Sequence, residues 1–554
     1  MTKIHFLRSN THFSFAFVAA LAGCGGGGGG DIGGASPVIG PAGSAAVATL
    51  ILPSTGKTPW NVATVAQFGL KNAAGAAVSG ALTCSSDTPS TLVVAADCSS
   101  INGKRLGNQL ITVSGGGVSA QASIKVIPQP QPLGTQGSAS SNGSGQYNLV
   151  VTTDGRVLGW GANVAGVLGQ GKSITQLASL ALPTAVKDAT GGADLKNIVS
   201  VSAGNQSAMA LTEDGEIFSW GDNNNGVLGR TALNGDPLPG KVVDAAGTST
   251  LKRVVSVSVG DENAVALLDD GSVLSWGYYS GQAGADPKRF PNSVPAVSGG
   301  GSLGNAVAVS AGWNWSAALL ADGRVVSWGY NAFVDGGQGL AAVTTGSRAP
   351  AFVVASGTSQ PISGVVSLSA GYNFGLALNA QGQVLTWGDN SSGQLGQSVL
   401  SSGRLLGAVL VKAPGGTAAL GNVAMVAAGG IHALALDTTG NVWSWGYSQN
   451  GQLGDGPNHP RVNSSALPAA VVGTNGLLQL NGVSSIAAGY GHSVAVKNDG
   501  NLLIWGDGFR SNLGQGGTGN AISYVPLSVK NEAGTAVLAL SPIGYWPNLL
   551  RRAN

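Results

Sequence analysis

Short apolar segments separated by polar turns recur along the chain from residue 135 onward. The stretch Ser207–Gly221 shows the unit clearly, because two five-residue apolar segments flank the tetrapeptide Glu-Asp-Gly-Glu. An Asp-Gly pair supplies the positive φ that a tight connection between two strands requires. The pattern therefore predicts a β-hairpin, and its alanine, valine and serine residues would let neighbouring sheets pack closely against both faces.

This unit returns along the chain at a regular interval. Trp-Gly pairs occur every 52 to 60 residues, with the tryptophans at Trp160, Trp220, Trp276, Trp328, Trp387, Trp445 and Trp505. A glycine precedes each tryptophan by five residues, and in repeats two to seven another glycine lies eleven residues earlier, at Gly204, Gly260, Gly312, Gly371, Gly429 and Gly489. One such unit cannot bury its faces alone, whereas seven in a closed ring cover one another. The spacing predicts an all-β chain with a seven-bladed β-propeller over residues 135–554.

Three parts of this pattern are irregular. Repeat three has the shortened segment Gly281–Gly284, and repeat four has Asp335–Gly339 without the usual leucine, so both predict altered outer turns. Repeat one begins with the serine-rich stretch 138–144, which is poor strand material, whereas Ala536–Trp546 looks like the missing opening strand of a repeat. We therefore expect the C-terminal segment to close the ring by completing the first blade.

Residues 36–128 predict a separate small domain. Six short apolar segments alternate there with turn clusters, which is typical of a small β-sandwich. Its last part, Ile111–Val126, resembles the final hairpin of bacterial immunoglobulin-like (Ig-like) domains. Cys84 and Cys98 both lie in this domain; outside the cytoplasm such a pair predicts a disulfide, the alternative being two buried thiols. The proline-rich segment 129–134 predicts a stiff linker to the propeller.

The first 23 residues resemble a bacterial export signal. Lys3 and Arg8 form a short basic start, and the apolar stretch Phe13–Leu21 is too short to span a bilayer. Leu21–Cys24 resembles the lipobox of bacterial lipoproteins, which implies cleavage before Cys24 and lipidation of that cysteine. The alternative is an ordinary secretory signal with an incidental cysteine. The glycine-rich residues 24–35 predict a flexible tether, and the resemblance favours anchoring in the outer membrane, on its periplasmic or surface face.

Composition narrows the function classes further. Charged residues make up only 9% of the chain, and 27 Lys and Arg nearly balance 25 Asp and Glu. This balance gives too little positive field for non-specific binding to nucleic acid, so we expect no nucleic-acid partner. Glycine reaches 90 of 554 residues without a Gly-X-Y period, which is typical of a globular protein rich in tight turns. No later segment has about 18 uninterrupted apolar residues, so the sequence predicts no transmembrane helix.

The propeller repeat resembles the regulator of chromosome condensation repeat. Gly429–Gly454 is its nearest match, with Gly-Gly-Ile-His-Ala followed by Gly-Asn-Val-Trp-Ser-Trp-Gly and Gly-Gln-Leu-Gly. The resemblance runs from about residue 135 to residue 546 and implies the same propeller fold. Members of that family include a nuclear exchange factor for a small GTPase, a plant UV-B photoreceptor and a secreted bacterial β-lactamase inhibitor. Because these functions differ, the fold alone does not choose among them.

Candidate catalytic and metal-binding residues are few. His432 and His492 take the same motif position in repeats six and seven, which favours a hydrogen bond to nearby backbone over a metal or catalytic role; the third histidine after the signal is His459. Asp222–Gly226 looks like a calcium loop but lacks the later glutamate. No nucleophile elbow, phosphate loop or paired catalytic carboxylates stand out. We therefore predict no metal, no cofactor and no enzymatic activity.

The two variable positions after the first motif glycine of each repeat are more informative. In the resembled propellers these positions lie at one mouth of the ring, where several members bind partners. Acidic and aromatic residues occupy them in the consecutive repeats three to five, so we expect these side chains to be neighbours and to act as interface anchors. The candidate binding residues are Asp261, Glu262, Trp313, Asn314, Tyr372, Asn373 and Tyr490. The alternative is a mouth whose rings only pack on one another, and the adjacent Trp315 and Phe374 are predicted to be core.

These observations favour a non-catalytic, lipid-anchored protein of the cell envelope, a monomer whose propeller binds a protein partner. The alternative is a carbohydrate-binding envelope module that uses the aromatic residues of the mouth. An inhibitor like the secreted family member is less favoured, because the mouth residues do not single it out. Nucleotide exchange on a small GTPase is also less favoured, because an exported lipoprotein would not meet a cytosolic GTPase.

Overall fold

The computed structural model describes residues 47–51, 57–130, 133–136, 146–278, 280–281, 288–330, 337–339, 348–398, 403–457, 464–517 and 521–540. Over these ranges the chain is all-β, with strands β1 to β37 and two three-residue 3₁₀ turns, η1 (Val164–Gly166) and η2 (Phe509–Ser511). A search of the same ranges finds no helix that is long and apolar enough to cross a membrane. The predicted export signal, Cys24, the tether and residues 282–284 and 335–336 of the two irregular outer turns lie outside the described residues.

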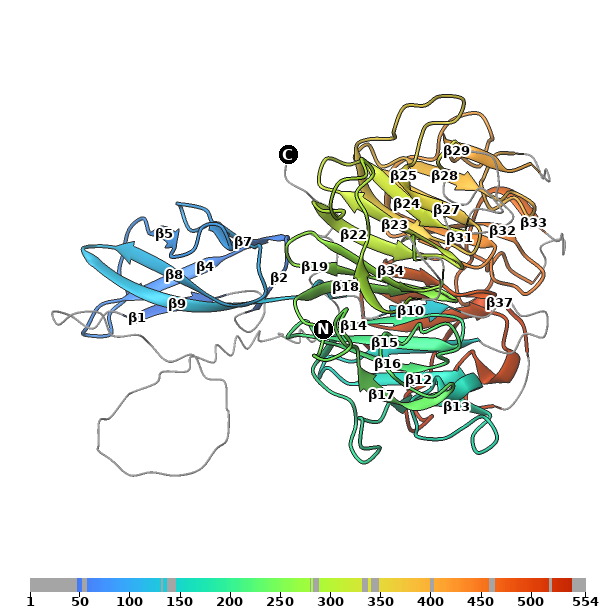
Figure 1. The fold of residues 1–554 in the computed structure, drawn as a ribbon, viewed down its shortest axis with the longest axis horizontal. Coiled ribbons are helices and arrows are strands. Elements are labelled where there is room, and N and C mark those ends of the chain that lie inside the picture. Colours follow the sequence, from blue (N-terminus) through green and yellow to red (C-terminus); the bar gives the residue numbers. More distant parts are fainter. Residues whose placement is uncertain are drawn as a thin grey trace, which may run out of the picture. The chain divides into compact units, whose positions relative to one another are not determined.

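Seven antiparallel four-stranded sheets follow one another along the chain, as the Trp-Gly spacing predicts, and we number them as blades one to seven (Figure 1). Their strands, in chain order and four to a blade, are β10 (Leu133–Gln136), β11 (Tyr147–Val151), β12 (Val157–Ala162), β13 (Ser179–Ala185); β14 (Ile198–Ala203), β15 (Ser207–Thr212), β16 (Ile217–Gly221), β17 (Asp236–Lys241); β18 (Val254–Val259), β19 (Asn263–Leu268), β20 (Val273–Gly277), β21 (Lys288–Ser293); β22 (Ala306–Ala311), β23 (Trp315–Leu320), β24 (Val325–Gly329), β25 (Arg348–Phe352); β26 (Val365–Ala370), β27 (Phe374–Asn379), β28 (Val384–Gly388), β29 (Leu405–Leu410); β30 (Val423–Ala428), β31 (His432–Asp437), β32 (Val442–Tyr447), β33 (Ser464–Ala470); and β34 (Val483–Ala488), β35 (His492–Lys497), β36 (Leu502–Gly506), β37 (Ser523–Ser528).

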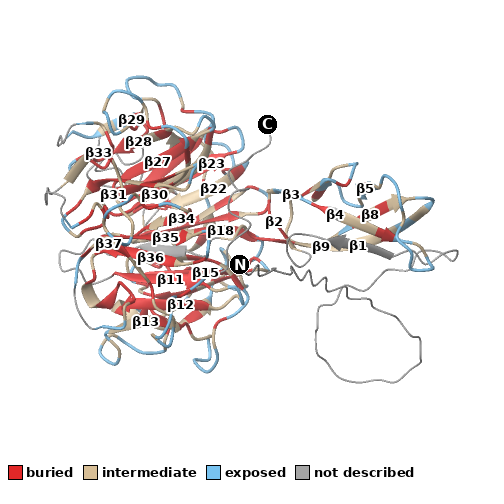
Figure 2. Ribbon diagram, turned by 180° about the vertical axis from the view of Figure 1, so that it is seen from behind, coloured by how far each residue is buried: buried red, intermediate tan, exposed pale blue. Residues whose placement is uncertain are grey.

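The predicted hairpin forms the centre of each blade. In blade two, β15 pairs with β16 so that Met209 lies opposite Ser219, and the Asp-Gly turn connects the two strands. Gly215 has a φ of 78°, and its N–H donates to the Thr212 carbonyl at 3.1 Å, as a tight turn requires. All six residues of β15 are buried, because the adjacent blades cover both faces of the sheet. Buried residues accordingly concentrate on the blade strands and exposed residues on the loops (Figure 2).

The tryptophans of the Trp-Gly pairs hold neighbouring blades together. The Trp220 indole N–H donates to the Val167 carbonyl of blade one at 2.7 Å, and the Trp276 indole donates to Val227 of blade two at 2.7 Å. Trp160 of blade one donates in the same way to the Asn512 carbonyl of blade seven at 2.8 Å. Each of these indoles is buried, so the hydrogen bond satisfies a polar group that would otherwise be costly to bury.

The ring closes differently from the prediction. The opening strand of blade one is β10, which pairs with β11 so that Leu133 lies opposite Val150. The segment Ala536–Trp546 was expected to take this position; in its described part, residues 536–540, Ala539 bridges Asn501 of blade seven. The Leu540 N–H donates to the Gly500 carbonyl at 2.9 Å, as the first strand residue of each other blade does to the hairpin glycine of the preceding blade, for example Ile198 to Gly155. Residues 541–554 lie outside the described residues.

Close approach of the backbone explains the first motif glycine of the repeats. A Cβ built on Gly204 would lie 2.2 Å from the Gly260 carbonyl oxygen, and one on Gly260 would lie 2.0 Å from the Gly312 oxygen. These glycines have no positive φ, so conformational freedom is not the reason for them. The innermost loops of successive blades are therefore too close for any side chain at this position.

Strands β1 to β9 form the smaller N-terminal domain. They are β1 (Val47–Ile51), β2 (Lys57–Pro59), β3 (Ala63–Val65), β4 (Gln67–Lys71), β5 (Thr83–Ser86), β6 (Leu92–Val94), β7 (Ser100–Gly103), β8 (Gly107–Gly115) and β9 (Val118–Ile127), in three sheets ordered β1-β4, β2-β9-β8-β5 and β3-β7-β6. The long hairpin β8–β9 supplies the buried residues Ile111 and Ile124. Cys84 and Cys98 form a disulfide, which confirms the predicted pairing; the Ig-like classification of this domain stays a prediction.

Charged contacts connect the small domain with the hairpin turns of blades two and three. Arg105 pairs with the buried Asp269 at 2.8 Å, and the Trp60 indole N–H donates to the backbone carbonyl of Asp269 at 3.2 Å. Lys125 pairs with Glu213 at 2.9 Å. Glu213 and Asp269 follow β15 and β19, at the opposite strand ends from the motif glycines. These contacts therefore leave the glycine loops available.

Candidate functional site: the propeller mouth

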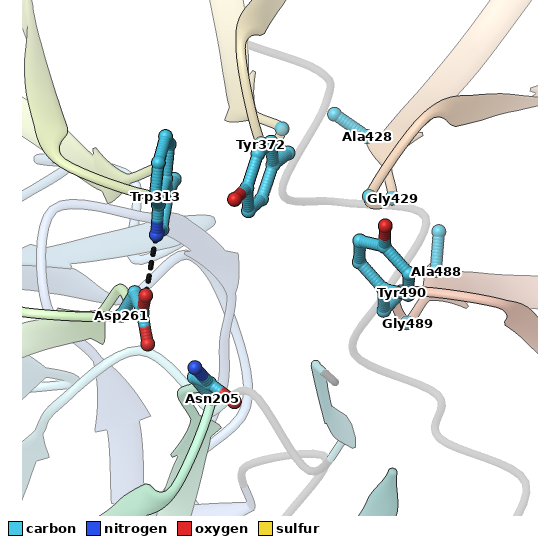
Figure 3. A pocket seen from close by; sticks show the side chains of 12 residues that line it. Asn205, Asp261, Trp313, Tyr372, Ala428, Gly429, Ala488, Gly489 and Tyr490 are labelled. Carbon is cyan, nitrogen blue, oxygen red and sulfur yellow. Dashed lines mark hydrogen bonds between the residues drawn. The ribbon is translucent and has the colours of Figure 1, made fainter. Parts of the chain in front are cut away.

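The loops that join the first and second strands of the blades form the mouth of the propeller. Each is tight because the motif glycine N–H donates across the loop, from Gly260 to the Asn263 carbonyl at 2.8 Å and from Gly312 to the Trp315 carbonyl at 2.9 Å. The residue after the glycine is thereby held on a short loop at the centre of the ring. Figure 3 shows these residues facing a common space, with Asp261 and Trp313 on one side and Tyr490 on the other.

A cavity of about 30 Å³ lies at this centre. Its walls are the side chains of Asn205, Asp261, Trp313, Tyr372 and Tyr490, together with small residues from the loops of blades four to seven. Because a buried water needs roughly 10–15 Å³ of such space, the cavity has room for about two waters or for the end of one side chain. Four of the sequence-predicted binding residues thus line one small cavity.

The aromatic side chains of the mouth contact one another. Trp313 stacks on Tyr372 with ring centroids 4.3 Å apart and an interplanar angle of 12°. Tyr490 meets Tyr372 edge-on, at 6.0 Å and 74°. The spacing of the repeats predicts that Trp313 and Tyr372 are neighbours, and the structure confirms this. All three rings are only partly buried, which leaves part of each available at the cavity.

Carboxylates make up the other side of the mouth. Asp261 accepts a hydrogen bond from the Trp313 indole N–H. Burial raises the pKa of Asp261, and the nearby charge of Asp222 raises it further. Burial and then the charge of Asp261 raise the pKa of Glu262, and burial raises the pKa of Asp222. The described part of the chain supplies no cation in an ion pair with any of these three carboxylates.

The two tyrosines of the mouth are in a similarly desolvated setting. Burial raises the pKa of Tyr372, and the charges of Asp261 and Glu262 raise it further. Burial also raises the pKa of Tyr490. Both phenols therefore keep their protons at neutral pH, so the negative charge of the mouth comes from the carboxylates alone.

Asn314 and Asn373 do not line the cavity. Both are buried. Their backbone carbonyls accept hydrogen bonds from the residues that follow the Trp-Gly pairs: Tyr330 donates to Asn314 at 2.8 Å, and Asp389 donates to Asn373 at 2.9 Å. They support the rim of the mouth. Trp315 and Phe374 are fully buried, which confirms that they belong to the core.

The histidines are buried between blades. His432 Nε2 lies 2.8 Å from the Ser493 hydroxyl, and His492 Nε2 lies 2.7 Å from Asn148 Oδ1. Burial lowers the pKa of each to about 3, so both rings are neutral. Their partners are side chains of the next blade and not the nearby backbone that the sequence suggested. His459 lies outside the described residues.

No group of three potential metal-ligating side chains occurs within the described ranges. The segment Asp222–Gly226, which looks like a calcium loop, is a turn in which the Asn224 N–H donates to the Asp222 carboxylate at 3.3 Å. Its carboxylate belongs to the acidic side of the mouth.

Sequence reasoning missed two contributors to this site. Asn205 occupies the same variable position as Asp261, one repeat earlier, and its side chain lies close enough to lower the pKa of the Asp261 carboxyl, against the larger effect of burial. Asp222 directly follows the Trp-Gly pair of repeat two, and its charge acts on both Asp261 and Glu262. The signal for Asp222 was its place in the repeat, because the residue after each Trp-Gly pair lies beside the mouth loop of its own blade.

Comparisons with known proteins recover the repeats. A profile of the RCC1-like domain matches residues 107–398, and a profile of the regulator of chromosome condensation (RCC1) repeat matches residues 381–436 and 439–496. A second RCC1 repeat profile matches residues 423–452 and 483–515. Together these matches cover the propeller from its first to its seventh blade.

Several curated proteins are similar over the same region. Protein pim1 of Schizosaccharomyces pombe is 27% identical over 367 residues, which is 61% of this chain and 64% of that protein. The ultraviolet-B receptor UVR8 of Arabidopsis thaliana is 27% identical over 384 residues, 67% of this chain and 77% of the receptor. The mouse (Mus musculus) E3 ubiquitin-protein ligase HERC2 is 28% identical over 381 residues, 67% of this chain but 7% of that protein. The chain thus spans less than two thirds of pim1 and a small part of HERC2.

Solved structures show the same fold. Yeast RCC1 (Prp20) bound to Kap60 has a TM-score of 0.55 at 24% identity, covering 74% of this chain and 86% of Prp20. Human WBSCR16 has a TM-score of 0.52 at 23% identity, covering 68% of this chain and 94% of WBSCR16. At these identities the likeness concerns the propeller fold alone.

Proposed function

The chain belongs to the family of RCC1-like propellers, and from that premise we propose that its mouth is a non-catalytic binding site for a protein partner. The observation that carries the proposal is the cavity walled by Asp261, Trp313 and Tyr372. Trp and Tyr side chains at the centre of an interface commonly carry most of its binding energy. The solved structure of yeast Prp20p is described with its binding to Gsp1p and histones, which supports protein binding as a use of this fold.

A protein partner fits the mouth better than a carbohydrate does. Sugar binding needs an open aromatic face, but Tyr372 is covered by the stacked Trp313 ring and by the edge of Tyr490. The cavity of about 30 Å³ is also too small for a sugar ring. The same geometry admits the end of one protruding side chain, which is how hot-spot residues of protein interfaces bind.

We propose further that the chain is exported and carries lipid on Cys24, in the outer membrane of a bacterial cell. The lipobox-like segment before Cys24 supports this, as does the Cys84–Cys98 disulfide, because disulfides persist mainly outside the cytoplasm. Growth with a labelled fatty acid should label the wild-type protein and not the Cys24→Ser variant. An unlabelled wild-type protein with an intact N-terminus would contradict this placement.

Partner binding is tested in two steps with the full chain. Crosslinking in envelope extract and mass spectrometry identify a candidate partner, and calorimetry with the purified partner then measures Kd. The double variant Trp313→Ala/Tyr372→Ala should weaken Kd by more than about tenfold, since truncating a hot-spot residue costs more than about 1–2 kcal/mol. Leu477→Ala is the matched control, because this apolar side chain is 79% exposed in the loop after β33, at the hairpin-turn end of blade six.

The outcomes separate the two functions. Equal Kd values for the wild type and the double variant would contradict binding through the mouth. Binding to a glycan array that is lost in the double variant, without any protein partner, would support the carbohydrate alternative instead. Circular dichroism and the thermal midpoint of each variant confirm that the propeller is intact.

A further inference from the structure

Four hydrogen-bond donors of the mouth are already used. The backbone N–H of Asp261 donates to the Trp313 carbonyl at 3.0 Å, that of Trp313 donates to the Tyr372 carbonyl at 3.3 Å, and that of Tyr372 donates to the Gly429 carbonyl at 3.3 Å. The indole N–H of Trp313 is bonded to Asp261. Apart from the phenol hydroxyls and the Asn205 amide, the described wall of the cavity therefore presents mainly acceptors, and an anionic ligand would find few groups that could donate to it.

Negative charge is concentrated beside that wall. Asp261 lines the cavity, Asp222 lies close enough to raise the pKa of Asp261, and Asp261 raises the pKa of Glu262. Asp222, Asp261 and Glu262 come from two neighbouring blades, and each is partly removed from water. Burying a carboxylate without a counter-charge is unfavourable, and two close carboxylates add repulsion to that cost. A cation in the cavity would offset both the cost of burying the carboxylates and the repulsion between them. Within the described residues no lysine or arginine forms an ion pair with them.

The aromatic side of the cavity suits the same kind of ligand. Trp313 and Tyr372 form a stacked pair directly beside the Asp261 carboxylate (Figure 3). Part of each ring remains exposed at the cavity, where it can contact the methylene stem of an arginine or lysine side chain. The volume of about 30 Å³ limits the ligand to a small head group.

We propose that this cavity receives the cationic end of an arginine or lysine side chain of the partner, held between the Trp313–Tyr372 pair and the carboxylate of Asp261, while the nearby charge of Glu262 adds to the attraction. This inference rests on the proposed function and names the chemistry that the mouth recognises. The guanidinium or ammonium group supplies the N–H donors that the acceptor-rich wall lacks. It also neutralises carboxylates that have no cationic partner in the described chain.

Small probes test this without a known partner. N-acetyl-arginine amide is compared with N-acetyl-citrulline amide, which has nearly the same shape but no charge, by saturation-transfer NMR and calorimetry at low salt. We expect the arginine probe to bind at least about tenfold more tightly than the citrulline probe. We expect Asp261→Asn and Glu262→Gln each to weaken the arginine probe severalfold, and the double variant to reduce it to the citrulline level.

A matched control separates a local effect from net charge. Asp499→Asn makes the same charge change in an exposed hairpin turn of blade seven and should leave binding of the arginine probe unchanged. Equal binding of the two probes, no detectable binding of the arginine probe, or an Asp499→Asn effect equal to that of Asp261→Asn would overturn the inference. A purified protein partner that loses affinity in Trp313→Ala/Tyr372→Ala but not in Asp261→Asn/Glu262→Gln would overturn it too, while leaving the proposed function in place.

Discussion

The Nε2 atom of His492 lies 2.7 Å from Oδ1 of Asn148, across the junction between the last and the first blade. Asn148 Nδ2 donates to the Asn512 carbonyl at 3.1 Å, so its Oδ1 must be an acceptor and His492 Nε2 must carry the proton. Trp160 donates to the same Asn512 carbonyl. Side chains that are more than 340 residues apart in sequence thus join the two ends of the propeller.

Removing this junction should destabilise the whole ring. His492→Ala leaves the Asn148 oxygen buried without its donor and opens a cavity in a fully buried site. We expect the free energy of unfolding to fall by about 2–4 kcal/mol, measured by urea denaturation. The exposed Leu477→Ala change should stay within about 0.5 kcal/mol of the wild type. A similarly small effect for His492→Ala would mean that the junction does not hold the ring closed.

Acid should weaken the propeller through its two buried histidines. The pKa of His432 and of His492 is about 3 in the folded chain, against an ordinary value of 6.5. Between these values the unfolded state binds more protons than the folded state, so stability decreases as the pH falls from about 6.5 toward 3. Each histidine contributes a slope of up to about 1.4 kcal/mol per pH unit in that window.

The double variant His432→Gln/His492→Gln isolates the contribution of these histidines to the pH dependence, because glutamine keeps a hydrogen-bond donor but cannot be protonated. Carboxyl groups whose pKa is raised in the folded chain, such as Asp261, make the protein more stable as the pH falls. Both proteins contain these groups, so their contribution cancels when the two slopes are subtracted. Urea denaturation at several pH values should give a smaller slope for the double variant. Parallel slopes would show that the histidines are not buried in the neutral form.

The blades could be predicted because their key residues do the same physical task in every repeat. Gly215 provides a positive φ at a hairpin turn, and Trp220 bridges to the preceding blade, so both recur at fixed intervals. The opening strand of blade one could not be predicted in this way. The segment Leu133–Gln136 is short and follows a proline-rich linker, and its place is set by backbone pairing with β11, which needs no side-chain pattern.

The site was predictable to a similar degree. Repeat arithmetic placed Trp313 beside Tyr372, because equivalent positions of adjacent blades must be neighbours. It could not give the stacking of the two rings or the hydrogen bond from Trp313 to Asp261, which depend on side-chain rotamers. Asp222 was within its reach, because the residue after each Trp-Gly pair bonds to the mouth loop of its own blade.

Substitution of a motif glycine should be far more damaging than substitution of an exposed one. In Gly260→Ala the new Cβ would lie 2.0 Å from the Gly312 carbonyl oxygen and 2.4 Å from Asn263 Oδ1, so the adjacent mouth loops must move apart. We expect a loss of about 3 kcal/mol or more in urea denaturation. Gly300→Ala meets no atom within 4 Å and needs no positive φ, so it should be neutral within about 0.5 kcal/mol. Equal effects of the two substitutions would contradict the close approach.

The disulfide should stabilise the small domain and not the propeller. Cys84 and Cys98 close a loop with a sequence separation of 14, for which the chain-entropy argument gives about 3 kcal/mol. In the double variant Cys84→Ser/Cys98→Ser, hydrogen exchange should therefore speed up in peptides from β5 to β9, while peptides from β27 keep their protection. Reduction of the wild-type protein should reproduce the effect, which controls for the buried serine hydroxyls. Unchanged exchange in β5 to β9 after reduction would show that the packing of Ile111 and Ile124 suffices to hold this domain together.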